Sequence, residues 1–114
     1  MHELSIAQNI VEIIETHAKE IHAKKVTEIV LEVGEISGVV PETLGFVWEI
    51  AIEKTIAENA KLIINKIPAK ANCLDCKKKF NIQDVYSLCP FCNKNNIDIF
   101  QGKELNVKTI KAEV

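Results

Sequence analysis

The chain has 114 residues and a net charge of −2, with 47% hydrophobic and 26% charged residues. This length and composition fit a small globular fold and exclude both two large cores and a disordered chain. Every basic residue is a lysine, so the guanidinium donors that nucleic-acid binders normally use are missing, and that class of function is disfavoured.

The first two predicted elements are a helix and a strand. Apolar residues recur at helical spacing from Leu4 to Ile21 and give an apolar face about 180° wide. His17 falls inside this face, so we expect a core or helix-end histidine there, whereas His22 should be exposed. Alternating β-branched residues from Val26 to Val33, followed by Gly34, predict a strand.

Three more elements complete the predicted fold outside the cysteine region. A helix is predicted from Pro41 to Ala57, because proline and an acidic residue suit the first turn of a helix. Its apolar surface exceeds what one sheet face needs, so part of it is expected to meet a partner or another part of the chain. Strands are predicted from Lys61 to Ile67 and from Glu104 to Val114, the latter with a bulge near Thr109. This last strand is expected to rejoin the first sheet.

All four cysteines lie in a polar segment before the last predicted strand. They form two Cys-x-x-Cys pairs separated by twelve residues: Cys73, Cys76, Cys89 and Cys92. Two such turns facing each other would bring four sulfurs to one tetrahedral zinc ion at about 2.3 Å. Iron in a rubredoxin-like site, a thiol redox couple and two free dithiols are the alternatives. Since four thiolates leave no open coordination position, zinc here would be structural.

The predicted fold class is α+β, with two helices packed on a small mixed β-sheet and an inserted zinc-ribbon-like lobe that carries the four cysteines. Residues 1–70 with 104–114 would form an α/β domain and residues 71–103 the zinc-binding lobe. Within this lobe, residues 79–87 are long enough to form a short hairpin between the two cysteine pairs.

The sequence also indicates where the protein works and what it does not do. It has no apolar run of about 18 residues and no basic signal-peptide start, so we expect a cytoplasmic protein without a membrane partner. Disulfides are not expected in that reducing compartment. No nucleophile–base pair or glycine-rich phosphate loop is present, so we expect no enzyme activity.

The N-terminus offers a second candidate metal site. The α-amine of Met1, the backbone nitrogen of His2 and its imidazole can close fused chelate rings, and Glu3 can supply a further donor. A planar, nitrogen-rich set of ligands suits Ni(II) or Cu(II). The alternative is an exposed terminal histidine that binds no metal, with Glu3 acting only as a favourable charge at the start of a helix.

Four motifs occur in a specific order along the chain. They are Met1-His2-Glu3 opening a helix, Gly34 to Glu42 after a strand, Ile67-Pro68-Ala69 before the first cysteine pair, and the paired Cys-x-x-Cys turns. In this order and spacing the chain resembles the HypA/HybF family of hydrogenase-maturation nickel metallochaperones, over essentially its whole length. It departs from the family at Lys54-Thr55, where many members have Gly-Thr, so the local turn is not expected to follow the family.

The resemblance implies a function and two metal sites. It implies nickel at His2, with help from the Met1 amine and the Glu3 backbone, and structural zinc at the four cysteines. It also implies delivery of nickel to the large subunit of [NiFe] hydrogenase with a HypB-type GTPase as partner, and to urease in some organisms. The other hypotheses are a zinc-ribbon adaptor without nickel function and a thiol redox switch.

Overall fold

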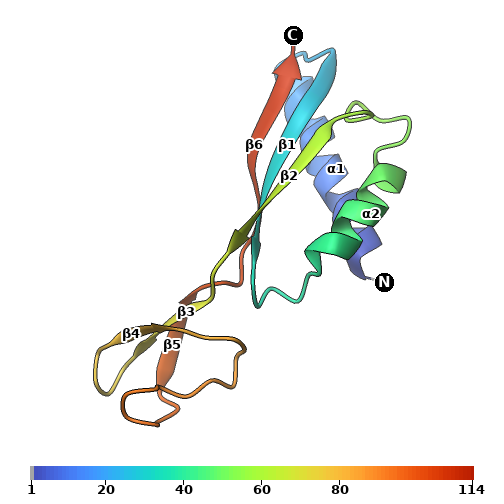
Figure 1. Cartoon of the computed structure of the whole chain (residues 1–114). Coiled ribbons are helices and arrows are strands. Elements are labelled where there is room, and N and C mark those ends of the chain that lie inside the picture. Colours follow the sequence, from blue (N-terminus) through green and yellow to red (C-terminus); the bar gives the residue numbers. More distant parts are fainter. Residues whose placement is uncertain (1) are drawn as a thin grey trace.

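The computed structural model describes residues 2–114, with His2 described by its backbone. The elements in this range are α1 (His2–Glu20), β1 (Lys25–Gly34), α2 (Pro41–Ala51), β2 (Lys61–Ile67), β3 (Lys70–Cys73), β4 (Lys79–Asn81), β5 (Ile97–Gln101) and β6 (Leu105–Glu113). They form the predicted α+β fold, in an elongated molecule of 54 × 27 × 17 Å (Figure 1). None of the helices in this range has the length and apolar character needed to cross a membrane.

The larger sheet is mixed and has β1 in its centre. Its strand order is β2-β1-β6, with β2 parallel and β6 antiparallel to β1. The last strand therefore rejoins the first sheet, as predicted. The register between β1 and β6 shifts where Val30 and Leu31 pair with Thr109 and Val107, which confirms the predicted bulge near Thr109.

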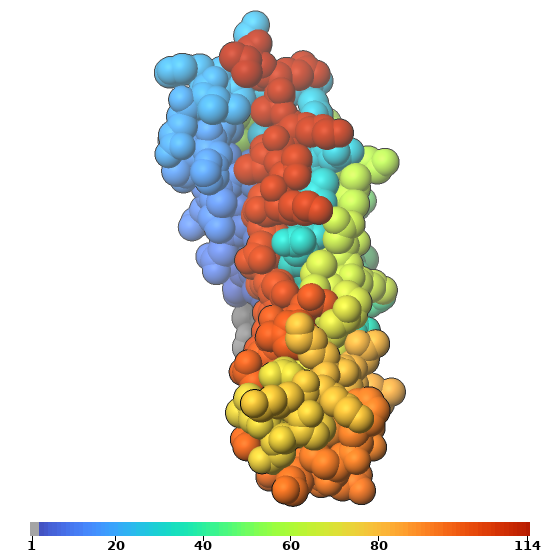
Figure 2. All heavy atoms as spheres, turned by 90° about the vertical axis from the view of Figure 1, so that its left-hand side faces the viewer, coloured from blue at the N-terminus to red at the C-terminus, as the bar shows by residue number. Residues whose placement is uncertain are grey.

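Helix α1 buries a narrower face than its sequence predicts. The helices pack on one side of the larger sheet (Figure 1), while Figure 2 shows β6, β1 and β2 side by side on the opposite side, which no helix covers. The buried residues of α1 are Ala7, Ile10, Val11, Ile14 and Ala18. His17 lies just outside this stripe: its side chain is 62% exposed, and its Nδ1 is 3.8 Å from a Glu20 carboxylate oxygen. Of the two expected positions, core or helix end, His17 takes the helix end, in the last turn of α1, and His22 is exposed as predicted.

Helix α2 ends at Ala51, six residues before the predicted end. Side chains satisfy the backbone beyond it: the Thr55 hydroxyl donates to the Ile52 carbonyl at 2.7 Å, and Lys54 N–H donates to the Glu58 carboxylate at 2.9 Å. Lys54 adopts the left-handed conformation, with φ of 60°. Such local hydrogen bonds compete with continued helix, and Lys54 occupies a conformation that glycine adopts more easily.

The second sheet belongs to residues 68–104, which carry the four cysteines and are called the cysteine region below. Its strand order is β4-β3-β5. It packs on a small cluster of Ala69, Ala71 and Ile82, to which Ile36 from the segment after β1 is added. The predicted hairpin within residues 79–87 was wrong, because β4 pairs with β3 and 82–87 contains no second strand. The predicted domain boundaries stay a prediction.

Two glycines allow the chain to cross closely where the two sheets meet. A Cβ at Gly34 would overlap the backbone carbonyl of Gly102, and Gly102 itself has a φ of 116°. Around this crossing, Ile36 N–H donates to the Gly102 carbonyl at 2.9 Å, and Ala69 N–H donates to the Glu35 carboxylate at 2.7 Å. The backbone approach at this junction therefore requires glycine.

We predict that Gly34→Ala lowers the free energy of unfolding by about 1–3 kcal/mol, because the added methyl group forces a backbone shift. The matched control is Gly45→Ala in α2, where an added Cβ meets nothing within 4 Å. It should raise stability by about 0.5–1 kcal/mol, since alanine favours helix. Chemical denaturation of both variants measures the difference, and equal stabilities would contradict the assigned role of Gly34.

Candidate metal sites

The four cysteines converge on one point. Their Sγ atoms all lie within 4.8 Å of one another, and the pairs Cys73 with Cys92 and Cys76 with Cys89 are each 3.6 Å apart. A tetrahedral zinc site with bonds of about 2.3 Å needs sulfurs roughly 3.8 Å apart. All four cysteines are free thiols rather than disulfides. This group could therefore hold a metal ion such as zinc, whose ligand preference it matches.

The two Cys-x-x-Cys turns have the same backbone geometry. In the first, Lys77 N–H donates to the Cys73 carbonyl at 2.8 Å, and in the second, Asn93 N–H donates to the Cys89 carbonyl at 2.8 Å. Lys77 and Asn93 both adopt the left-handed conformation, with φ of 61° and 60°. Asparagine tolerates this conformation well, so Asn93 was a sequence signal for it, whereas Lys77 was not.

The thiols differ in their tendency to ionise. A hydrogen bond from the Cys76 backbone N–H lowers the pKa of Cys73 to about 7. For Cys92 the Lys94 backbone N–H acts in the same direction, but desolvation and the neighbouring thiols of Cys73 and Cys89 outweigh it and raise the pKa to about 12. Four sulfurs this close cannot all carry negative charge unless a cation neutralises them. The thiol cluster therefore favours binding of a divalent metal.

The candidate nickel ligands lie at the start of α1. Met1 and the side chain of His2 lie outside what the structure describes, while the His2 backbone forms the first residue of the helix. The Glu3 carboxylate accepts a hydrogen bond of 3.5 Å from the backbone N–H of Val40. Hydrogen bonds from its own backbone N–H and from Val40 lower the pKa of Glu3, so that it is ionised at neutral pH. The first turn of α1 thus lies beside the segment that leads into α2.

The remaining histidines do not join either site. Among the described residues, the cysteines are the one group of three or more side chains arranged to hold a metal. His17 pairs with Glu20 further along α1, and His22 follows the opposite end of the helix. The contact between Glu3 and Val40 had no sequence signal, because 37 residues separate the partners.

Comparison with known proteins gives consistent matches over the whole chain. The family model "Hydrogenase/urease nickel incorporation, metallochaperone, hypA" matches residues 1–112. The chain is 39% identical to a hydrogenase maturation factor HypA of Geobacter sulfurreducens over 113 residues, which is 99% of this chain and 100% of the relative. It is 38% identical to the HypA of Aquifex aeolicus over 114 residues, covering 100% of this chain and 99% of the relative.

A solved structure matches the fold as well. The solution structure of the Ni metallochaperone HypA from Helicobacter pylori aligns with a TM-score of 0.72 and 25% sequence identity. The alignment covers 98% of this chain and 97% of that one. The similarity therefore extends over both sheets and the cysteine region.

Proposed function

Because this chain belongs to the HypA family of nickel-incorporation metallochaperones, we propose that it binds Ni(II) at its N-terminus and delivers it during maturation of [NiFe] hydrogenase. The proposed ligands are the Met1 amine, the backbone nitrogen and imidazole of His2, and Glu3. The observation that carries this proposal is that α1 begins at His2. The second and third residues therefore lie in the first turn of a helix.

The first turn of a helix is chemically suited to this ligand set. The first four N–H groups of an α-helix have no carbonyl partner within the helix. Ni(II) can therefore displace the amide protons of His2 and Glu3 without breaking an N–H to carbonyl hydrogen bond of the helix, and the Glu3 N–H gives up only its bond to the Glu3 carboxylate. The resulting ligands are nitrogens in fused chelate rings, which favour a planar geometry and hence Ni(II) or Cu(II) over zinc.

The anchored carboxylate of Glu3 supports the same site. Its hydrogen bond to Val40 N–H ties the first turn of α1 to the start of α2. A negative charge at this position also interacts favourably with the N-terminal end of the helix dipole.

The proposed task is transfer of an ion, and it requires no catalytic centre. The recipient would be the large subunit of a [NiFe] hydrogenase, with a HypB-type GTPase as partner, and urease in organisms that have it. The family description, which names hydrogenase and urease nickel incorporation, supports this choice. We propose the cytoplasm as the compartment, because four closely spaced thiols stay reduced there.

We further propose that Cys73, Cys76, Cys89 and Cys92 bind one structural zinc ion. The sulfur positions support a closed tetrahedral site, and a closed site has no position for substrate or water. Zinc would stabilise the region around β3, β4 and β5, whose apolar cluster is small. The two metals would then have separate tasks, nickel as cargo and zinc as a structural component.

We predict that His2→Ala removes the saturable binding of one Ni(II) per chain. Placing Gly-Ser ahead of Met1 should have the same effect, because it removes the α-amine from the chelate rings. Isothermal titration calorimetry of untagged protein measures both. The control is His22→Ala, at the other end of a helix about 27 Å long, which should bind nickel normally. Unchanged nickel affinity in the His2 variant would place the site elsewhere.

We predict that Cys89→Ser lowers the zinc content below one ion per chain and disorders the cysteine region. Nickel binding and the α1 and α2 helices should persist, because the main core contains no residue of this region. Metal analysis, circular dichroism and nickel titration test this, with Ser87→Ala as a control in the same segment. Since zinc displaces the thiol protons, zinc affinity of the unaltered protein should fall as the pH is lowered. Loss of helix in Cys89→Ser would contradict the separation of the two parts.

A further inference from the structure

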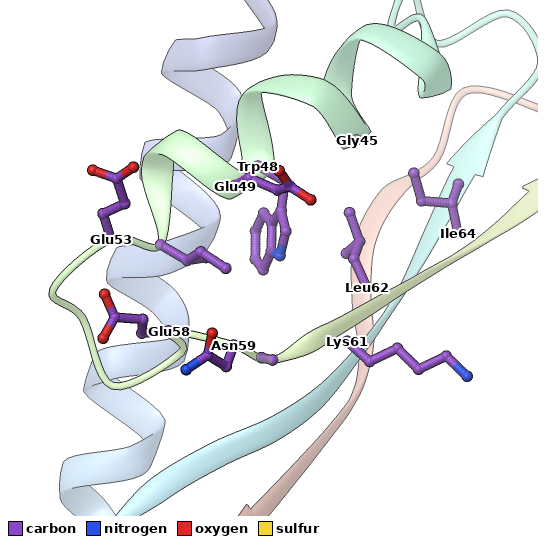
Figure 3. A pocket seen from close by; sticks show the side chains of 11 residues that line it. Gly45, Trp48, Glu49, Glu53, Glu58, Asn59, Lys61, Leu62 and Ile64 are labelled. Carbon is purple, nitrogen blue, oxygen red and sulfur yellow. The ribbon is translucent and has the colours of Figure 1, made fainter.

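A groove separates α2 from the edge of the larger sheet, away from both metal sites. It has a volume of about 850 Å³. Figure 3 shows its walls: Gly45, Trp48 and Glu49 come from α2, Lys61, Leu62 and Ile64 come from β2, and the segment that joins them closes one end. Neither the thiol cluster nor the first turn of α1 contributes to it.

One wall of the groove is an unpaired strand edge. Strand β2 is the outermost strand in the order β2-β1-β6, so its far edge has no strand partner within residues 2–114. Backbone N–H and C=O groups on such an edge are a template for another strand. Helix α2 lies beyond this edge in Figure 1. A fourth strand beside β2 would therefore be covered by α2 rather than left exposed.

The floor of the groove contains an unsatisfied hydrogen-bond donor. Trp48 is 2% exposed, and its indole Nε1–H has no acceptor among the described residues. Figure 3 shows this nitrogen pointing toward Leu62 of β2. Buried tryptophan N–H groups normally have a partner. A carbonyl group brought in beside β2 would supply one once the atoms that cover the indole nitrogen move aside.

The charged side chains that line the groove indicate which kind of segment can bind there. Glu49, Glu53 and Glu58 all line it and are exposed. In the described range, the recorded ion pairs involve other carboxylates, those of Glu20, Glu28, Glu42 and Glu113. Lys61 also lines the groove, so three negative charges face one positive charge there. This negative excess repels an acidic segment or a nucleic-acid backbone and attracts a basic one.

We propose that this groove binds an extended, lysine- or arginine-bearing segment of a partner protein, which adds to β2 as a fourth strand. The backbone of the segment pairs with the β2 edge, alternate apolar side chains pack on Trp48 and Leu62, and its basic side chains face Glu49 and Glu53. This is strand addition, in which the backbone provides affinity and the side chains provide specificity. The proposal goes beyond nickel binding, which needs only the N-terminus.

The test uses a short acetylated peptide of alternating lysine and valine as the probe, followed by NMR of the ¹⁵N-labelled full chain. Trp48 is the single tryptophan, so its indole N–H signal is unambiguous. We expect saturable shifts of this signal and of the β2 amides. Strand β6 is the other sheet edge and serves as an internal control, so its amides should not shift. A glutamate-for-lysine peptide and one N-methylated at alternate residues should both fail to bind.

A pair of matched variants isolates the role of charge. Glu49→Lys with Glu53→Lys should weaken binding about tenfold, as expected for two solvent-exposed ion pairs. Glu12→Lys with Glu15→Lys, which changes the net charge equally on α1, should bind the peptide as the unaltered chain does. Nickel titration of both variants should be unchanged, which separates this proposal from the nickel site.

Four outcomes would overturn the proposal. They are no shift at about 1 mM peptide, the weakest affinity of interest; equal binding of the acidic peptide; shifts at β6 as large as those at β2; and self-association of the chain through β2 at NMR concentration. The last outcome would identify a second copy of the chain as the occupant instead.

Discussion

The architecture depends on the pairing of β1 with strands from both sides of the cysteine region. Strands β2 and β6 flank β1, although residues 68–104 separate them along the chain. The chain must therefore leave the sheet after β2 and return to the same sheet in β6. The cysteine region is the insertion that connects these two strands. Gly34 and Gly102 let the two ends of this insertion meet at the end of β1.

The same junction relates the cysteine region to the first turn of α1. Ile36, just after β1, packs in the small core beside Ala69 and Ile82. A few residues later, Val40 N–H contacts the Glu3 carboxylate at the start of α1. One short segment thus touches both the cysteine region and the helix that begins with the proposed nickel ligands. The groove at β2 lies outside this segment, so a partner can dock there without covering either metal site.

Sequence patterns predicted the three strands of the larger sheet well, missed the three strands of the second sheet, and predicted the ends of packed elements less well. The range Lys61–Ile67 of β2 agrees with its prediction, because a β-rich run bounded by proline is a strong local signal. Of the core and helix-end positions expected for His17, the helix end was right, because helical periodicity fixes an apolar face, whereas the neighbouring elements decide how much of that face is covered. The predicted end of α2 failed because hydrogen bonds of Thr55 and Glu58 replace helical ones.

The sequence by itself determined the chemistry of the chain: the thiol ligands and their spacing, the terminal histidine, and the family to which these motifs belong. These are local features, since ligand type and short spacing do not depend on distant contacts. The tertiary structure decided which groups meet. It brought Glu3 to Val40, Gly34 to Gly102 and α2 over the free edge of β2, because each of these contacts joins residues that lie far apart in sequence and is set by packing rather than by local pattern.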